Sequence, residues 1–335
     1  MPASPVSITA STDAEAIGVD LGGTKMAVGV VDRRAGVLYR SEARSLGIGE
    51  DELIATLEAE LRAAIAARPQ ARAIGLGVPC TIDRERGVAI NAVNLPLEDV
   101  PLRDLISERI GLPVSLDNDA NVAALAEHRH GAGKGAANVV MLTIGTGIGG
   151  GLIINGEPFR GSNGAGAELG HIVVEVDGPP CQGSCPNRGC IEAIASGTAL
   201  GREGVAAAKR EPDSALGRLL AAGEQLDGLA VSRAALDGDE VALDVVRLIG
   251  ERLGAALSGL ANTFDPDVIV LGGGVMALGE LLIKPATAEM RARALPPQNQ
   301  VAVRAAELGA DAGMIGAATL AFEEAGLIAV SGADH

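Results

Sequence analysis

The chain has 335 residues and a formal charge of −16, a length that favours two domains and excludes a small disulfide scaffold. Hydrophobic residues make up 47% of it and charged residues 21%, which is typical of a folded globular protein rather than a disordered one. Its acidic balance, with three Phe, one Tyr and no Trp, disfavours a nucleic-acid partner, because such proteins need a basic face and aromatic stacking platforms.

The first half of the sequence alternates strands with helices. Residues 17–32 predict two strands joined by a Gly-Gly-Thr turn, and residues 51–68 predict an amphipathic helix that ends before Pro69. Two buried strands are expected at 74–79 and 113–117, and a helix begins at Asn118 or Asp119 and runs to residue 130. We therefore expect an α/β domain with a mixed or parallel sheet. His128 and His130, near the end of that helix, are interpreted as solvated.

The second half repeats the theme of the first. Residues 139–154 predict a strand, the glycine-rich turn GTGIGGG and a second strand. A helix is expected at 239–263, followed by the strand 268–271 and three glycines, and a last helix at 310–325. The two similar hairpins suggest a duplicated architecture.

No membrane span or secretory signal is predicted. A span needs about eighteen uninterrupted apolar residues, whereas the longest apolar stretch, residues 139–154, contains two Thr and five Gly. Residues 1–14 contain neither a basic n-region nor an apolar h-region. We therefore expect a cytoplasmic protein without a membrane partner.

The glycine turns point to phosphate binding. Glycines let backbone N–H groups approach phosphate oxygens closely, and Asp20 at the end of its strand is placed to hold hydrated Mg²⁺. For either turn alone, an ordinary hairpin is the simpler interpretation. Together they favour a nucleotide triphosphate held by one turn from each domain. Neither matches a P-loop or a Rossmann fingerprint.

Four of the five residues 117–121, DNDAN, carry carboxylate or amide side chains. Capping the following helix requires only one of them. A carboxylate at the end of a strand in an α/β protein is placed to orient a substrate hydroxyl and accept its proton.

A histidine and three cysteines lie within twenty residues: His171, Cys181, Cys185 and Cys190. They supply the nitrogen and sulfur ligands of a closed, structural zinc site. The alternative is a Gly/Pro loop with reduced, unliganded cysteines, and Cys80, alone on its strand, is such a case.

Taken together, these motifs resemble the ROK family of repressors and sugar kinases, and within it the bacterial glucokinases. The motifs in family order are IGVDLGGTK, NDAN, IGTGIGGG, ELGH, RGCIEAIASG and LGGG, between residues 17 and 274, and the resemblance extends over residues 17–325. It implies an actin-like ATPase fold of the ribonuclease H-like, hexokinase type, with two domains around a central cleft. The small domain would comprise residues 1–118, completed by a helix at 311–328, and the large domain residues 119–310, with the zinc loop and a dimerisation surface.

The resemblance also implies ATP-dependent phosphorylation of D-glucose at its 6-hydroxyl, with Mg²⁺ accompanying ATP, a structural Zn²⁺ and a homodimer or homotetramer. By similarity, Asp119 would be the general base. The other sugar ligands would be Asn94, Asn118, Glu168, His171 and Glu192. The ATP site would comprise Asp20, Gly22, Gly23, Thr24, Lys25, Thr146, Gly147, Gly273 and Gly274.

The sequence departs from the family in two places. The usual zinc run is Cys-x-Cys-x4-Cys, whereas here three residues separate Cys181 from Cys185, so Cys181 departs from the usual position of the first cysteine ligand. Cys80 stands where the family usually has Gly.

Several functions compete with glucose phosphorylation. Fructose, mannose or an N-acetylhexosamine are alternative substrates, and polyphosphate is an alternative phosphoryl donor. A sugar-sensing ROK repressor is disfavoured, because only sixteen residues precede Ile17 and the chain is acidic. An actin- or chaperone-type ATPase would share the fold without binding sugar.

Overall fold

The computed structural model describes residues 14–92 and 95–327, which form two units. The first runs up to Ala126 and resumes at Asp311, and the second is the continuous segment Glu127–Ala310. The chain therefore passes between the units twice. The first passage falls inside helix α3 (Asp119–His130).

The first unit is built on a five-stranded mixed sheet in the order β3-β2-β1-β4-β8. The predicted hairpin is confirmed as the antiparallel pair β1 and β2, while β4 and β8 run parallel to β1. The strands are β1 (Glu15–Leu21), β2 (Lys25–Asp32), β3 (Val37–Arg44), β4 (Ala71–Val78) and β8 (Val114–Asn118). A small antiparallel sheet, which no sequence pattern predicted, comprises β5 (Cys80–Asp83), β6 (Val88–Ala92) and β7 (Glu98–Val100).

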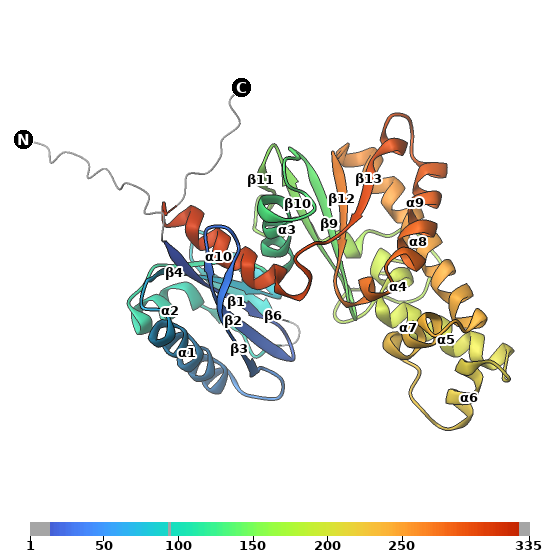
Figure 1. Cartoon of the computed structure of the whole chain (residues 1–335), viewed down its shortest axis with the longest axis horizontal. Helices are drawn as coiled ribbons and strands as arrows, with labels where there is room; N and C mark the ends of the chain where they lie inside the picture. The colour runs from blue at the N-terminus through green and yellow to red at the C-terminus, as the bar shows by residue number, and fades with distance from the viewer. Residues whose placement is uncertain (1–13, 93–94, 328–335) are drawn as a thin grey trace, which may run out of the picture. The chain divides into compact units, whose positions relative to one another are not determined.

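Helices cover both faces of this sheet (Figure 1). The apolar stripe of α1 (Glu50–Ala67), including Leu57 and Leu61, joins the odd-numbered side chains of β1 in one core, to which α2 (Leu102–Ile110) also contributes. The other face of the sheet carries α10 (Ala312–Glu324). There the sheet has glycines, because a Cβ on Gly75 would lie 1.7 Å from the carbonyl oxygen of Ala317. The last helix thus rests directly on the backbone of the sheet.

The second unit repeats the topology of the first. Its sheet has the order β11-β10-β9-β12-β13, with β9, β10 and β11 antiparallel and β12 and β13 parallel to β9. The strands are β9 (Val139–Ile144), β10 (Ile148–Ile154), β11 (Glu157–Pro158), β12 (Val268–Gly272) and β13 (Ala302–Ala305). The expected duplication is confirmed.

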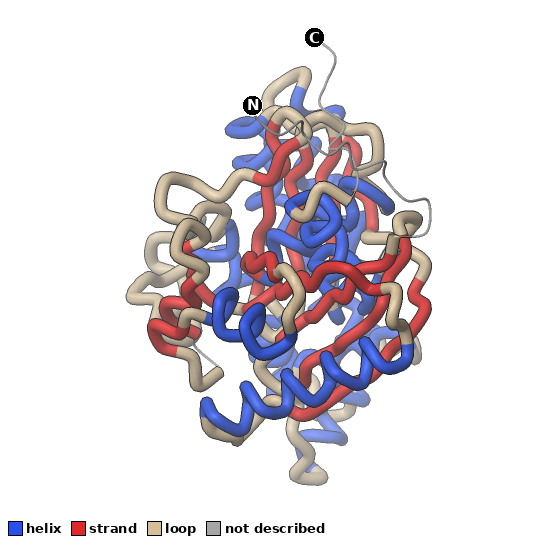
Figure 2. Tube along the Cα trace, turned by 90° about the vertical axis from the view of Figure 1, so that its left-hand side faces the viewer, coloured by secondary structure: helices blue, strands red, loops and turns tan. Residues whose placement is uncertain are grey.

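Helices contribute more residues to the second unit than strands do. Helix α8 (Glu240–Phe264) begins after Asp239, whose side chain accepts a hydrogen bond from the backbone N–H of Ala242. It packs Leu253 and Leu257 into the same core as Ile269 of β12. Figure 2 shows helices lying against the strands in both units. The helices are α4 (Ile191–Ala195), α5 (Gly197–Arg210), α6 (Ala215–Ala221), α7 (Gly228–Leu236), α8 (Glu240–Phe264) and α9 (Glu280–Arg293), with short 3₁₀ turns η1 (Leu169–His171), η2 (Gly274–Leu278), η3 (Gln298–Gln300) and η4 (Gly309–Asp311).

A buried carboxylate joins the two chain segments of the second unit that lead into the first. Glu127 of α3 is 0% exposed. Its Oε2 accepts hydrogen bonds from the backbone N–H groups of Ala132 (2.9 Å) and Glu307 (3.1 Å), and its Oε1 accepts one from Leu308 (2.8 Å). A Cβ on Gly131 would lie 2.1 Å from Oε2. Glu127 therefore fixes the end of α3 against residues 307–308.

One interpretation from the sequence is wrong. His128 is buried, and its Nε2 lies 2.8 Å from the carbonyl oxygen of Ala136. Burial lowers the pKa of His128 below its ordinary value.

Among the helices that the structure describes, none has both the length and the apolar character needed to cross a membrane.

Candidate functional site

Three polar side chains of the first unit meet at one edge of its sheet. The strands β1, β4 and β8 are parallel neighbours, with Asp20 opposite Gly77 and Val78 opposite Asn118. Their carboxyl ends therefore place Asp20, Asn118 and the following Asp119 at the same edge. The predicted general base and the predicted Mg²⁺ residue lie together.

The two carboxylates of this edge influence each other electrostatically. Burial raises the pKa of Asp20 to about 6, and the negative charge of Asp119 adds to the rise, while the Lys25 ammonium opposes it. A cation near Asp20 would favour its ionised form. The edge is therefore chemically suited to a divalent ion or to accepting a proton.

The remaining residues of the DNDAN segment hold the start of α3. Asn118 Oδ1 accepts hydrogen bonds from the backbone N–H groups of Ala120 (2.9 Å) and Asn121 (3.2 Å), so the expected cap is Asn118. Asp117 is buried, and its Oδ1 accepts from the backbone N–H of Asn118 (2.8 Å) and from Asn121 Nδ2 (3.1 Å). Asp117 and Asn118 thus fix the backbone that carries Asp119.

The glycine turn between β1 and β2 is anchored from the chain that follows β3. Ser45 Oγ donates to the Gly22 carbonyl oxygen (2.6 Å), and the Ser45 backbone N–H donates to the Thr24 carbonyl oxygen (3.2 Å). Gly23 lies between these anchors. The ammonium of Lys25 lies 2.9 Å from Glu42 Oε1 at an exposed position, so this structure pairs Lys25 with a carboxylate.

The corresponding turn of the second unit is anchored by its helices. The Gly145 carbonyl accepts from the backbone N–H of Gly197 (2.8 Å), and the Thr146 carbonyl accepts from Thr198 Oγ1 (2.9 Å). Glu192 Oε2 accepts from the backbone N–H of Ile148 (2.8 Å). A Cβ on the intervening Gly147 would lie 2.3 Å from that oxygen, which explains the need for glycine.

A third glycine turn lies at the same edge of the second sheet. Gly272 of β12 pairs with Thr143 of β9. The next residue, Gly273, has φ of 89°, and a Cβ there would lie 2.5 Å from the Ile144 carbonyl oxygen. Only glycine fits. Gly274 then begins η2.

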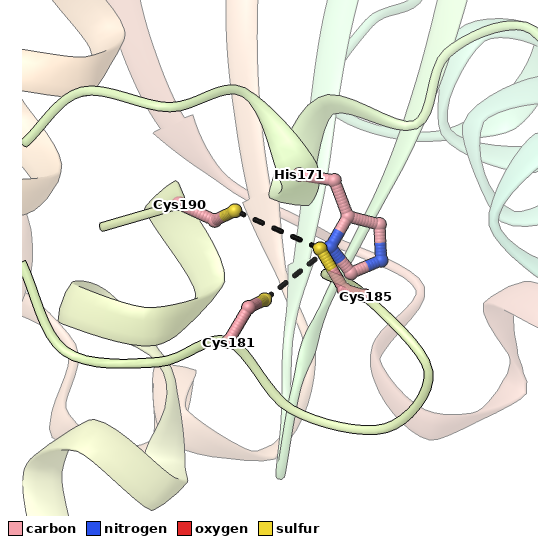
Figure 3. Close-up of side chains that lie close together, drawn as sticks. All are labelled: His171, Cys181, Cys185 and Cys190. Atoms are coloured by element: carbon pink, nitrogen blue, oxygen red, sulfur yellow. Dashed lines mark hydrogen bonds between the residues drawn. The ribbon is translucent and has the colours of Figure 1, made fainter. Parts of the chain in front are cut away.

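The histidine and the three cysteines converge (Figure 3). One ligand atom from each of His171, Cys181, Cys185 and Cys190 lies within 4.8 Å of all the others. Cys181 Sγ is 3.5 Å from His171 Nδ1, and Cys185 Sγ is 3.9 Å from Cys190 Sγ. Cys181 thus belongs to the cluster in spite of its altered spacing, whereas Cys80 lies elsewhere, in the first unit.

The donor set fits a tetrahedral metal ion. With Zn–S near 2.3 Å and Zn–N near 2.0–2.1 Å, tetrahedral geometry requires separations of roughly 3.5–3.8 Å between ligand atoms, close to those observed. Burial raises the pKa of the Cys181 thiol, so a bound cation would supply the charge that favours thiolates. Four protein ligands leave no open position, as in a structural site.

Two further predicted sugar ligands lie near the cluster in the sequence. Glu168 is exposed and directly precedes η1, which carries His171. Glu192 is buried in α4, and its Oε1 lies 3.6 Å from Cys181 Sγ. Asn94 lies outside the described residues. Sequence reasoning missed Ser45 and Thr198, because each acts through a contact with a distant turn that no local motif reveals.

The sequence matches a known protein family over nearly its whole length. The model of the ROK family matches residues 16–324. A glucokinase of Thermotoga maritima is 37% identical over 312 residues, which cover 92% of this chain and 98% of that protein. A glucokinase of Streptomyces coelicolor is 39% identical over 92% of this chain and 97% of its own length.

A solved structure extends the comparison to the fold. The ROK family glucokinase of Streptomyces griseus, in complex with glucose and AMPPNP, is 38% identical and has a TM-score of 0.79, with 92% of this chain and 99% of that chain covered. The expected actin-like ATPase fold is thereby confirmed. From the match over residues 16–324 and from these relatives it follows that the chain belongs to the ROK family.

Proposed function

We propose that the protein is a glucokinase, which transfers the terminal phosphoryl group of ATP to the 6-hydroxyl of D-glucose. The observation that carries this proposal is the 37–39% identity to two glucokinases over nearly their whole length. The Asp20–Asn118–Asp119 edge and the glycine turns supply the chemistry that such a transfer needs.

In the first unit, Asp119 is the proposed general base. It orients the attacking hydroxyl and takes up its proton late in the reaction, since bond formation to the nucleophile lags in a loose transition state. Asn118 hydrogen-bonds a neighbouring hydroxyl. Asp20 would hold the Mg²⁺ that accompanies ATP, and the ion would supply charge neutralisation of the phosphates.

The proposed phosphate ligands are the backbone N–H groups and hydroxyls of the glycine turns. They comprise Gly22, Gly23, Thr24 and Lys25 in the first unit and Thr146 and Gly147 in the second, with Gly273 and Gly274 under the adenosine. In this structure Lys25 is paired with Glu42, so its proposed role requires that the ammonium leave this partner.

The cysteine cluster supports sugar binding in this proposal. Zinc would be held by Cys181, Cys185, Cys190 and Nδ1 of His171, and it would supply rigidity rather than chemistry. The Nε2 edge of the ring turns away from the sulfurs (Figure 3) and would bind a sugar hydroxyl. Glu168, Glu192 and Asn94 complete the proposed sugar ligands.

We propose further that the protein is cytoplasmic and works as a homodimer or homotetramer, on the basis of the family resemblance. Size-exclusion chromatography with light scattering measures the mass in solution. A mass of one chain across micromolar concentrations would contradict the assembly without affecting the proposed reaction.

The reaction is tested by an assay that couples ADP release to NADH oxidation, with a panel of hexoses. We expect glucose to give the highest kcat/KM, and a higher value for fructose, mannose or an N-acetylhexosamine would identify the substrate instead. Asp119→Asn should lower kcat by at least about a hundredfold, the range of general base catalysis, while glucose still binds. Asp51→Asn, on the exposed start of α1, is the matched control. A variant at Asp119 with most of the wild-type rate would overturn the base assignment.

A further inference from the structure

The loop that carries two of the cysteines also contacts the glycine turn between β9 and β10. Gln182 directly follows Cys181. Its Nε2 donates to the carbonyl oxygen of Thr146 (3.3 Å) and to Ser196 Oγ (3.3 Å), and its Oε1 lies 2.9 Å from Thr198 Oγ1. A carbonyl oxygen can only accept, so the amide nitrogen must face Thr146. The nitrogen of the Gln182 amide is therefore held by Thr146 and Ser196, whereas its oxygen shares the single proton of the Thr198 hydroxyl with the Thr146 carbonyl.

The backbone on either side of Gln182 is fixed by the cluster loop. The Cys181 backbone N–H donates to the Asn187 carbonyl (2.9 Å), and the Cys185 backbone N–H donates to the Gln182 carbonyl (3.3 Å). Gln182 belongs to the three residues between Cys181 and Cys185, the gap that departs from the usual ROK spacing. The loop between Cys181 and Cys185 thus supplies a side chain that reaches the glycine turn.

Planarity of the peptide bond gives this contact a consequence for the turn. The carbonyl of Thr146 and the N–H of Gly147 belong to one peptide plane and point in opposite directions. Holding the Thr146 oxygen against Gln182 and Thr198 therefore directs the Gly147 N–H away from the loop. In the same way, the bond from the Gly197 N–H to the Gly145 oxygen directs the N–H of Thr146.

We propose that Gln182 is a positioning residue for nucleotide binding, through which the cysteine cluster orients the backbone N–H groups of the β9–β10 turn toward a triphosphate. This inference rests on the proposed function, because it takes that turn as a phosphate ligand. It adds a second role to the cluster: beside supporting His171, the loop sets the affinity for ATP.

The test compares Gln182→Ala and the isosteric Gln182→Glu with wild type. The carboxylate of Gln182→Glu would face the Thr146 oxygen without a proton to share. Ser184→Ala, an exposed position in the same gap, is the matched control. Affinity for AMPPNP is measured by calorimetry, KM for ATP and for the hexose by steady-state kinetics, and zinc by elemental analysis after purification with the metal present.

For both Gln182 variants we expect Kd for AMPPNP and KM for ATP to rise about fivefold, the effect of one lost hydrogen bond. KM for the hexose and the zinc content should stay within twofold of wild type, and Ser184→Ala should match wild type throughout. Equal rises in both KM values, unchanged AMPPNP affinity or loss of zinc would each overturn the inference.

A second pair of variants keeps the inference testable if the Gln182 variants do not fold. Thr198→Val removes the hydroxyl that contacts the Thr146 carbonyl and Gln182, whereas Thr198→Ser retains it. We expect weaker AMPPNP binding for Thr198→Val only, and equal affinities for the pair would count against an anchored turn. A wild-type protein that binds AMPPNP but phosphorylates no hexose would refute the proposed function while leaving the positioning role open to measurement.

Discussion

Replacing Glu127 should weaken the second unit more than any exposed substitution. In Glu127→Ala, the backbone N–H groups of Ala132, Glu307 and Leu308 lose a fully buried acceptor. A buried donor left without a partner, such as the N–H of Ala132, costs about 1–3 kcal/mol, and the partly buried N–H groups of Glu307 and Leu308 cost less, because water reaches them. Allowing for water that enters the space of the lost side chain, we expect the free energy of unfolding to fall by about 3–6 kcal/mol.

The isosteric variant separates hydrogen bonding from packing. In Glu127→Gln, the amide oxygen can face the two N–H groups that Oε2 now serves, and the amide nitrogen then faces the N–H of Leu308. One hydrogen bond is lost and two remain, so the expected loss is about 1–3 kcal/mol. Glu157→Ala is the control, since this carboxylate is exposed and lies 3.9 Å from Arg129; we expect a change below about 1 kcal/mol.

The measurement is urea denaturation followed by circular dichroism, because the chain has no Trp to report by fluorescence. Wild type and variants should differ in the midpoint with similar slopes. If Glu127→Ala unfolds within 1 kcal/mol of wild type, or if Gln proves as damaging as Ala, then the three hydrogen bonds do not hold the two segments together as argued.

Further predictions concern pH, glycine packing and the metal. The pKa of Asp20 is raised from 3.8 to about 6, so its ionisation lowers the free energy of unfolding as pH rises through this range. Asp20→Asn should therefore be up to about 3 kcal/mol more stable than wild type at pH 8 and little different at pH 4. A difference that stays constant between these pH values would contradict the raised pKa. Gly75→Ala should prevent stable folding, because its Cβ would lie 1.7 Å from a carbonyl oxygen of α10. Gly259→Ala on α8, where a Cβ would meet nothing within 4 Å, should raise the free energy of unfolding by about 0.5–1 kcal/mol. Urea midpoints in the reverse order would refute the packing argument. A strong chelator should lower the melting temperature of wild type. Cys185→Ser should melt at that lower temperature and show no further response to the chelator. A wild-type melting temperature that the chelator leaves unchanged would exclude a structural metal.

The elements that the sequence predicted well are those with a strong periodic or punctuated signal. The helix expected at 51–68 lies at Glu50–Ala67, and that expected at 239–263 lies at Glu240–Phe264, because each carries an apolar stripe that matches the helical period. Both hairpins were found from their glycines. The small sheet of β5–β7 was missed, since its three- to five-residue strands are too short for a clear alternation.

In the candidate site, too, the features with a local sequence signal were predicted and those that depend on distant contacts were not. Local motifs predicted the convergence of the four candidate metal ligands. They also put Asp20 and Asp119 each at the end of a strand, but that these strands end at one edge of the sheet was learned only from the structure. Gln182 and Glu127 could not be predicted, because the partners of Gln182 lie up to 36 residues away and those of Glu127 up to 181. Such roles depend on tertiary contacts that no local pattern encodes.

The position of α10 has a consequence for the order of assembly during synthesis. Residues 14–126 emerge first, but the helix Ala312–Glu324, which covers one face of their sheet at Gly18 and Gly75, is made much later. On the ribosome the second unit, Glu127–Ala310, is therefore the first to have its whole sequence available, although its synthesis starts later. Until the last helix is released, the sheet backbone at Gly18 and Gly75 is not covered by α10. A chaperone and a neighbouring nascent chain would compete to bind this uncovered face.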